Sequence, residues 1–374
     1  MRRWIRPHWF LWGLLAIFLW WIWRNVAWAQ VAALLKGLLG WRILAWLSVN
    51  AVVTLLFSLR WWLILAAFGQ RVNYLKLAGY RLAGFAISFI TPGPQFGGEP
   101  LLVYALTRNE HIPNAQALAS VGLDKSLELL ASFIFLAAGM LVILMGGLLP
   151  VSSMLGMALP LAVLILLPAG YLVLLWLGKR PVSRLLGILF ARFAGYRRRA
   201  GRIESAVSQF SNWAEQVHRA EDLAGDFCRY RPGLFALIVI QSLLVWVSIV
   251  VEYWLSFWLL GLWLPVQQVV FLLVAARLAM VLPAPGGIGP LEASQALAAQ
   301  VLNVAPAVVV SVMLLVRARD FLLAGTGGIL AVYVVQKPNE QQEVMSAQVE
   351  ETKRAGTKFA KKTNTSHENI GGRV

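Results

Sequence analysis

Charged side chains lie inside apolar segments of this 374-residue chain. A charge at the centre of a bilayer costs at least about 2.5–3.5 kcal/mol, so it needs an opposite charge or a wet cavity. The residues that we single out for this reason are Arg60, Glu99, Lys125, Glu128, Glu252, Glu292, Arg317 and Asp320. They could form a polar cavity that receives a charged headgroup, or they could neutralise one another and hold helices together. In the second case Lys125 would pair with Glu128 and Arg317 with Asp320, since residues three apart meet on one face of a helix. Both interpretations stay open.

These charges belong to a pattern that occurs twice. Residues 92–99 read PGPQFGGE and residues 285–292 read PGGIGPLE, so each break has the form P-G-x5-E. The two breaks are 193 residues apart, since 285 − 92 = 193 and 292 − 99 = 193. The downstream base and acid recur after 192, since 317 − 125 = 192 and 320 − 128 = 192. A repeated unit with a broken helix and buried charge is how many secondary transporters form a site at mid-membrane.

Proline and glycine interrupt the apolar segments at both breaks. The glycines either permit tight turns or leave backbone N–H groups open to an anionic phosphate. Glu99 and Glu292 follow the turns, where a carboxylate can also cap the next helix. The break residues that we assign to the candidate site are Pro92, Gly93, Gly97, Gly98, Pro285, Gly286, Gly287 and Gly289.

The composition is that of an integral membrane protein. Hydrophobic residues make up 59% and charged residues 13% of the chain, against about 25% charged in soluble domains. The apolar runs are continuous, which predicts an all-α polytopic protein. The single cysteine, Cys228, excludes an intrachain disulfide and a cysteine-based metal site, and the histidines are scattered, so we expect no cofactor.

The apolar runs predict six full spans and two broken segments. The spans are expected over residues 9–28, 43–69, 117–149, 154–177, 234–260 and 305–335, the first of them uncleaved. The broken segments cover 77–106 and 268–302, and each is interpreted as a re-entrant hairpin of two short arms. This arrangement places the eleven Lys and Arg of residues 178–232 on the cytoplasmic side, as the positive-inside rule requires.

The resulting topology makes residues 43–149 and 234–335 inverted-topology repeats, with both hairpin tips at the midplane. Residues 1–336 would form the membrane domain, and the polar residues 337–374 a disordered cytoplasmic tail. Both termini are expected in the cytoplasm. Between the repeats, apolar residues at helical spacing from Ile203 to Val217 predict an amphipathic helix. That helix either lies in the membrane interface or packs on the bundle as a connector.

At these motifs the chain resembles the family built on the transmembrane region of lysylphosphatidylglycerol synthase, also called the flippase-like domain. The resemblance covers about residues 10–336. It rests on the two breaks with their glutamates, on Asp124-Lys125-x-x-Glu128, on Leu59-Arg60-Trp61 and on Arg317. The family more often has Glu-Arg where this chain has Asp124-Lys125, and lysine lacks the bidentate phosphate contact of arginine.

The resemblance implies lipid translocation in a bacterial inner membrane, with membrane lipids as partners. We expect Lys125, Arg317 and Arg60 to contact phosphate, and Glu99 and Glu292 to handle an amine or a proton. An accessory subunit of a lipid-modifying pathway is the alternative, and a homo-oligomer or a biosynthetic partner stays open. A membrane-embedded enzyme that acts on a lipid headgroup is a less favoured alternative, and an enzyme is not expected, because no Ser-His or His-Asp pair falls at bilayer depth. Nucleic acid is not an expected partner.

Overall fold

The computed structural model describes residues 28–37, 40–91, 97–147, 151–188, 204–282 and 284–336. The predicted first span at 9–28 lies almost wholly outside these residues, and the predicted tail at 337–374 lies outside them entirely. The chain divides into two units, residues 1–331 and 332–374, and the description below concerns the first. Every regular element in the described residues is helical.

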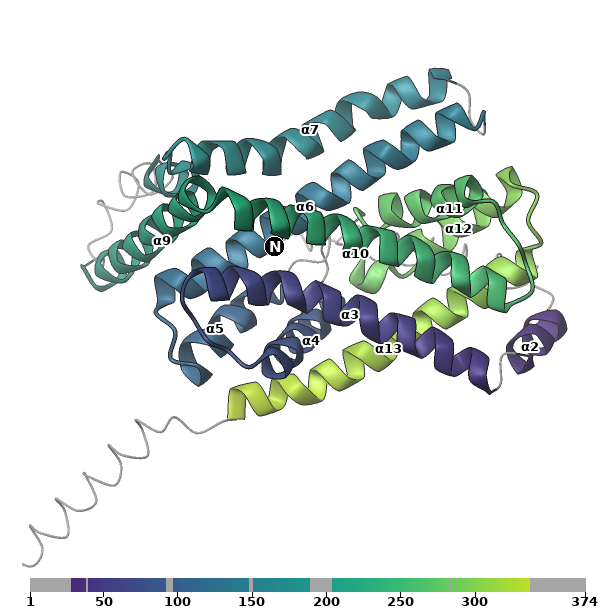
Figure 1. Ribbon diagram of the computed structural model, residues 1–374, viewed down its shortest axis with the longest axis horizontal. Helices are drawn as coiled ribbons and strands as arrows, with labels where there is room; N and C mark the ends of the chain where they lie inside the picture. The colour runs from purple at the N-terminus through teal and green to yellow at the C-terminus, as the bar shows by residue number, and fades with distance from the viewer. Residues whose placement is uncertain are drawn as a thin grey trace, which may run out of the picture. The chain divides into compact units, whose positions relative to one another are not determined.

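The helices follow one another along the chain as drawn in Figure 1. Their bounds are α2 (Trp28–Lys36), α3 (Trp41–Ala67), α4 (Tyr74–Ile90), α5 (Glu99–Asn109), α6 (Asn114–Met145), α7 (Val151–Trp176), α9 (Glu204–Tyr230), α10 (Pro232–Leu259), α11 (Val266–Ala279), the short 3-10 turn η1 (Pro285–Gly287), α12 (Pro290–Val301) and α13 (Pro306–Gln336).

Four described helical stretches are long and apolar enough to cross a membrane: α3, α6, α10 and residues Ala158–Trp176 of α7. They coincide with the predicted spans at 43–69, 117–149, 234–260 and 154–177. Helix α13 covers the predicted span at 305–335 and has 31 residues, but it does not meet the same apolarity criterion. It carries three charged residues near its middle, Arg317, Arg319 and Asp320.

Each predicted broken segment consists of two short helices, as the Pro-Gly pattern indicates. Helices α4 and α5 have 17 and 11 residues, and α11 and α12 have 14 and 12. At 1.5 Å per residue they are about 17–26 Å long, which is less than the roughly 30 Å of a hydrocarbon core. Both second arms begin with a proline in the first turn, where its missing N–H costs nothing. The two arms of each pair pack against each other.

Local structure recurs after 192 residues. The Trp62 indole donates to the Val72 carbonyl at 3.1 Å, and the Trp254 indole donates to the Leu264 carbonyl at 3.1 Å. The donor and the acceptor of the second hydrogen bond each lie 192 residues after those of the first, since 254 − 62 = 192 and 264 − 72 = 192. The connection after α5 and the connection after α12 each contain a non-glycine residue with φ 54°, and these residues are His111 and Asn303. Residues 43–149 and 234–335 therefore share connections as well as helix order.

The equivalent helices α3 and α10 run antiparallel. Helix α3 packs along α10, and Figure 1 shows the two side by side. The Trp46 indole donates to Ser256 Oγ at 3.0 Å, whereas the Gln241 side-chain amide donates to the Leu56 carbonyl. Because residue numbers rise along α3 as they fall along α10, the two chains point in opposite directions.

Helix α9 packs on the bundle through its apolar face over its second half. Ala220, Ala224, Phe227 and Cys228 are buried in one cluster with residues of α3, α6, α7 and α10. The buried Glu221 carboxylate accepts from two backbone N–H groups at the start of the helical residues 181–188, at 2.8 and 2.9 Å. Residues 217–228 therefore pack on the bundle, as the connector alternative predicts, and do not lie free in the membrane interface. The side chains of residues 203, 207 and 210 lie outside the described part.

Candidate functional site

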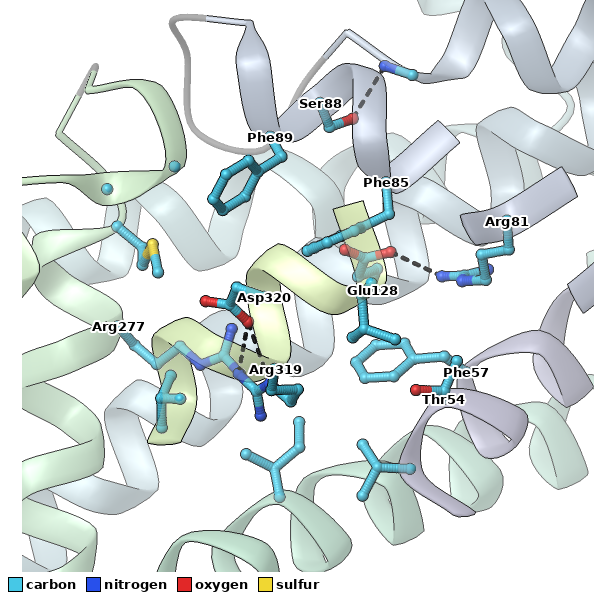
Figure 2. Close-up of a pocket in the computed structure, with 18 of the residues that line it drawn as sticks. Thr54, Phe57, Arg81, Phe85, Ser88, Phe89, Glu128, Arg277, Arg319 and Asp320 are labelled. Carbon is cyan, nitrogen blue, oxygen red and sulfur yellow. Dashed lines mark hydrogen bonds and ion pairs between the residues drawn. The ribbon is translucent and has the colours of Figure 1, made fainter. Parts of the chain in front are cut away.

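A cavity of about 300 Å³ lies between two helix groups (Figure 2). The first group comprises α3, α4, α5 and α6, the second comprises α10, α11, α12 and α13, and residues of all these helices line the cavity. Part of its lining is apolar, with Phe57, Phe85, Phe89, Met280 and Met313 among the contributors. The other part is charged: Arg81, Glu99, Asp124, Lys125, Glu128, Glu252, Arg277, Arg319 and Asp320. A cavity with both characters suits an amphipathic ligand.

Two arginines and two carboxylates form a closed network on the α3, α4 and α6 side. Arg60 Nε lies 2.7 Å from Asp124 Oδ1, and Arg60 Nη2 lies 3.3 Å from Glu128 Oε2. Arg81 reaches the same two acids from α4, with distances of 2.8 Å to Asp124 Oδ2 and 3.1 Å to Glu128 Oε2. Figure 2 draws the Arg81–Glu128 contact at the cavity wall. Because Arg60 is only 1% exposed, this network holds α3, α4 and α6 together from inside the protein.

Lys125 extends this network to the first broken segment. Its Nζ lies 3.1 Å from Glu99 Oε1 and 3.6 Å from Glu128 Oε1. The other Glu99 oxygen accepts a hydrogen bond from the Gly97 N–H at 2.8 Å. Glu99 therefore ties the start of α5 to α6 and also satisfies a backbone donor in the turn.

Arg317 organises the turn of the second broken segment. Its Nη2 lies 2.6 Å from Glu292 Oε1, while its guanidinium also donates to the carbonyls of Gly286 and Gly287 at 2.6 and 3.1 Å. Glu292 Oε2 in turn accepts from the Gly289 N–H at 2.6 Å. All three glycines have positive φ, at 57°, 66° and 97°, a region that side chains with a Cβ rarely occupy. The planar guanidinium fork thus closes a turn that only glycine fits easily.

Arg319 forms the second network at the cavity wall. It pairs with Glu252 of α10, and its Nη2 lies 2.9 Å from Asp320 Oδ1. Its Nη1 also donates to Asn50 Oδ1 of α3 at 3.3 Å, so this arginine links the two helix groups. Figure 2 shows Arg319 and Asp320 at the end of the cavity opposite Arg81 and Glu128.

The structure brings most of the predicted site residues to one place. Those that line the cavity are Gly98, Glu99, Lys125, Glu128, Glu252, Gly286, Gly287 and Asp320. Arg60, Glu292 and Arg317 lie behind the wall and bind protein groups. Pro92 and Gly93 lie outside the described residues, and Pro285 opens η1.

The expected pairings are met in one repeat and not in the other. Lys125 and Glu128, three residues apart, form an ion pair as expected. Arg317 and Asp320 do not, because the donors of Arg317 are taken up by Glu292 and by two carbonyl groups. Asp320 pairs with Arg319 instead. The charges in and behind the cavity wall are nevertheless equal in number: the bases are Arg60, Arg81, Lys125, Arg277, Arg317 and Arg319, and the acids are Glu99, Asp124, Glu128, Glu252, Glu292 and Asp320, twelve residues in all.

Four more charged residues line the cavity that are not among the site residues predicted from the sequence: Arg81, Asp124, Arg277 and Arg319. A signal for two of them was present. Arg81 lies in the first arm of one broken segment, 92 − 81 = 11 residues before its Pro-Gly, and Arg277 lies 285 − 277 = 8 residues before the other. These two bases are 277 − 81 = 196 residues apart, so they do not occupy equivalent positions of the repeat, although each lies in the first arm of a broken segment.

The geometry can be compared with known proteins at this point. The family model described as "Lysylphosphatidylglycerol synthase TM region" matches residues 10–328. The chain belongs to this family. No curated protein and no solved structure matches it. The lysylphosphatidylglycerol synthase TM region match includes both broken segments and all twelve charged residues. With its apolar helices, it makes this chain a multi-pass membrane protein of the flippase-like kind.

Proposed function

We propose that this protein moves a lipid with a polar or charged headgroup across the membrane through the cavity between its two helix groups. The observation that carries the proposal is the lining of that cavity. Nine charged side chains from both groups share its surface with a cluster of aromatic and aliphatic side chains. A headgroup would occupy the charged part, and the acyl chains would leave past the apolar part toward lipid.

The helix geometry supports a re-entrant, inverted arrangement. Arms α4, α5, α11 and α12 are too short to cross a bilayer singly, so each pair would enter and leave on the same face. The equivalent helices α3 and α10 run antiparallel, which is the relation expected of inverted-topology repeats. Helix α13 would then be a span whose charges face the protein interior. The membrane would be a bacterial inner membrane, with both termini in the cytoplasm.

Alternating access would follow from rocking one helix group against the other around the cavity. Arg319 links the groups through Asn50 of α3, and it would have to give up this partner as the groups move. Lys125 and Glu99 face the cavity and would contact the headgroup. We assign Arg60 and Arg317 to bracing, since both are buried and hydrogen-bonded to protein groups.

The test is lipid movement in proteoliposomes that contain the purified full chain and headgroup-labelled phospholipids. Thr54 lines the cavity from α3, so Thr54→Trp should fill it and slow translocation at least tenfold. Glu99→Gln should also slow it, because it removes the charge that holds Lys125. The matched control is Val52→Trp, which places the same ring on an exposed position of α3 (51% exposed) and should translocate like wild type.

Equal rates in wild type, Thr54→Trp and Glu99→Gln would overturn the assignment of transport to this cavity. A wild-type protein that moves no anionic, aminoacylated or polyprenyl lipid would overturn the transport function itself. That second result would favour the accessory-subunit alternative, in which the membrane domain supports a lipid-modifying partner.

A further inference from the structure

The charges of the cavity wall are paired within the protein, with one exception. On the α3, α4 and α6 side, Arg81 and Lys125 each contact two carboxylates. On the other side, Arg319 contacts Glu252 and Asp320. Arg277 of α11 forms no ion pair and no hydrogen bond with any described residue, although it lines the same cavity.

Aromatic rings hold the Arg277 guanidinium in place of a carboxylate. Its Cζ lies 4.8 Å from the ring centroid of Trp246. On α6, Phe135 stacks on the same indole with a centroid distance of 4.4 Å and an interplanar angle of 14°. A guanidinium over an indole is attracted by the ring and keeps its N–H donors, which lie in the guanidinium plane, available. The packing therefore orients this arginine without consuming its donors.

A second arginine lies close to the first. Figure 2 shows the Arg277 and Arg319 side chains reaching the same end of the cavity. Two like charges in a site shielded from water repel each other, and the charges of Glu252 and Asp320 offset that repulsion. Both carboxylates nearest this point, Glu252 and Asp320, already bind Arg319, so they do not neutralise Arg277 by direct contact.

We propose that Arg277, with Arg319 beside it, is the residue that binds the headgroup phosphate of a lipid in the cavity. This inference rests on the proposed function. An arginine fork binds phosphate oxygens in pairs, which gives both charge neutralisation and orientation. The bases of the other network would bind phosphate only after losing an existing carboxylate partner. The headgroup phosphate thus enters on the α11 and α13 side, and the acyl chains extend along the apolar lining.

Binding to the purified full chain in detergent tests the assignment. The probes are dihexanoylphosphatidylglycerol, dihexanoylglycerol, which has the same chains without the phosphate, and inorganic phosphate. Arg277→Gln should weaken phosphatidylglycerol binding at least tenfold and leave diacylglycerol binding within twofold of wild type. Arg277→Lys should fall between, because lysine keeps the charge and loses the fork. Arg42→Gln, at an exposed position, is the control and should bind like wild type.

Folding provides an independent readout. Because Arg277 has no direct carboxylate partner, Arg277→Gln breaks no ion pair and should lower the melting temperature less than Arg60→Gln does. If that variant fails to fold, Arg277→Lys carries the test, with at least threefold weaker phospholipid binding expected. Unchanged phospholipid binding in the folded variants would overturn the assignment.

The outcomes separate this inference from the proposed function. A wild-type protein that moves lipid while Arg277→Gln binds and moves phosphatidylglycerol normally would refute the phosphate acceptor alone. If the wild-type protein moves no lipid but binds phospholipid, and Arg277→Gln loses that binding, the transport function would be refuted and the role of Arg277 in phosphate binding would stand. Inorganic phosphate that binds more tightly than the phospholipid, and is lost in Arg277→Gln, would support the anion site and identify free phosphate as its ligand.

Discussion

Replacing Arg60 should be among the most destabilising single changes in the described part of the chain. Arg60 is 1% exposed and lies between Asp124, at 2.7 Å, and Glu128, at 3.3 Å. Its network contains three bases and three acids, so Arg60→Gln leaves two bases against three. Removing one partner of a buried ion pair costs about 3–5 kcal/mol, because the remaining charge stays buried without compensation. Arg81 still contacts both acids, which places the expected loss near the lower end, about 3 kcal/mol.

The assay is reversible unfolding in mixed detergent micelles, followed by circular dichroism. A double-mutant cycle with Asp124→Asn isolates the pair. Removing both charges restores the balance of the network, so the double variant should lose less than the sum of the single variants. The expected coupling is about 2–3 kcal/mol, at the upper end for contacting residues.

The matched control is the same substitution at Arg277, another arginine at the same cavity. Arg277→Gln breaks no ion pair but loses the contact with Trp246, so its free energy of unfolding should fall by only about 1 kcal/mol. A loss below about 1 kcal/mol for Arg60→Gln, or a coupling below about 0.5 kcal/mol, would show that this network does not hold the helices together. Equal destabilisation at Arg60 and Arg277 would refute the distinction between paired and unpaired arginines.

Two further predictions concern packing. Gly98→Ala should destabilise the protein by about 1–3 kcal/mol and slow lipid movement, because an added Cβ would lie 2.1 Å from the Gly84 carbonyl oxygen and force α4 and α5 apart. Gly122→Ala in α6 meets nothing within 4 Å, so an effect there equal to that of Gly98→Ala would contradict the argument. Burial raises the pKa of the Cys228 thiol in α9 to about 11, so the reactive thiolate is scarce at pH 7 and becomes more abundant as the pH rises toward 11. Maleimide labelling of this single cysteine should be slow in the folded protein and fast in sodium dodecyl sulfate, and fast labelling before unfolding would disprove the burial of this face.

Much of the helix plan was predictable because apolar length and Pro-Gly breaks leave a local mark in the sequence. The runs at 43–69, 117–149, 154–177 and 234–260 became α3, α6, the apolar part of α7 and α10. The fate of α9 was not predictable in the same way. The amphipathic pattern from Ile203 to Val217 fits either a membrane surface or a protein groove. The burial of Phe227 and Cys228 among neighbouring helices shows that the second half of α9 packs in a protein groove.

The partners of the charges could not be predicted, because they depend on how each helix is rotated in the bundle. Arg317 and Arg319 are two positions apart, so at about 100° per residue they project about 200° apart. One therefore faces η1 and the other the cavity. Spacing alone favoured a pair between Arg317 and Asp320, yet a guanidinium with five donors satisfies more of them on Glu292 and two carbonyls than on one acid.

Two interpretations of the buried charges, mutual neutralisation and a polar cavity, turn out to describe different residues of the same networks. In each helix group one arginine is turned away from the cavity and braces the fold: Arg60 against α6, and Arg317 against the glycine turn. Other bases of the same group face the cavity. This division explains how so many charges are tolerated in apolar helices, because the braces compensate acids that would otherwise stay unpaired. It also distinguishes Arg277 from the other bases. This guanidinium forms no ion pair with a described residue and contacts only the ring of Trp246, so it does not connect one helix to another by charge.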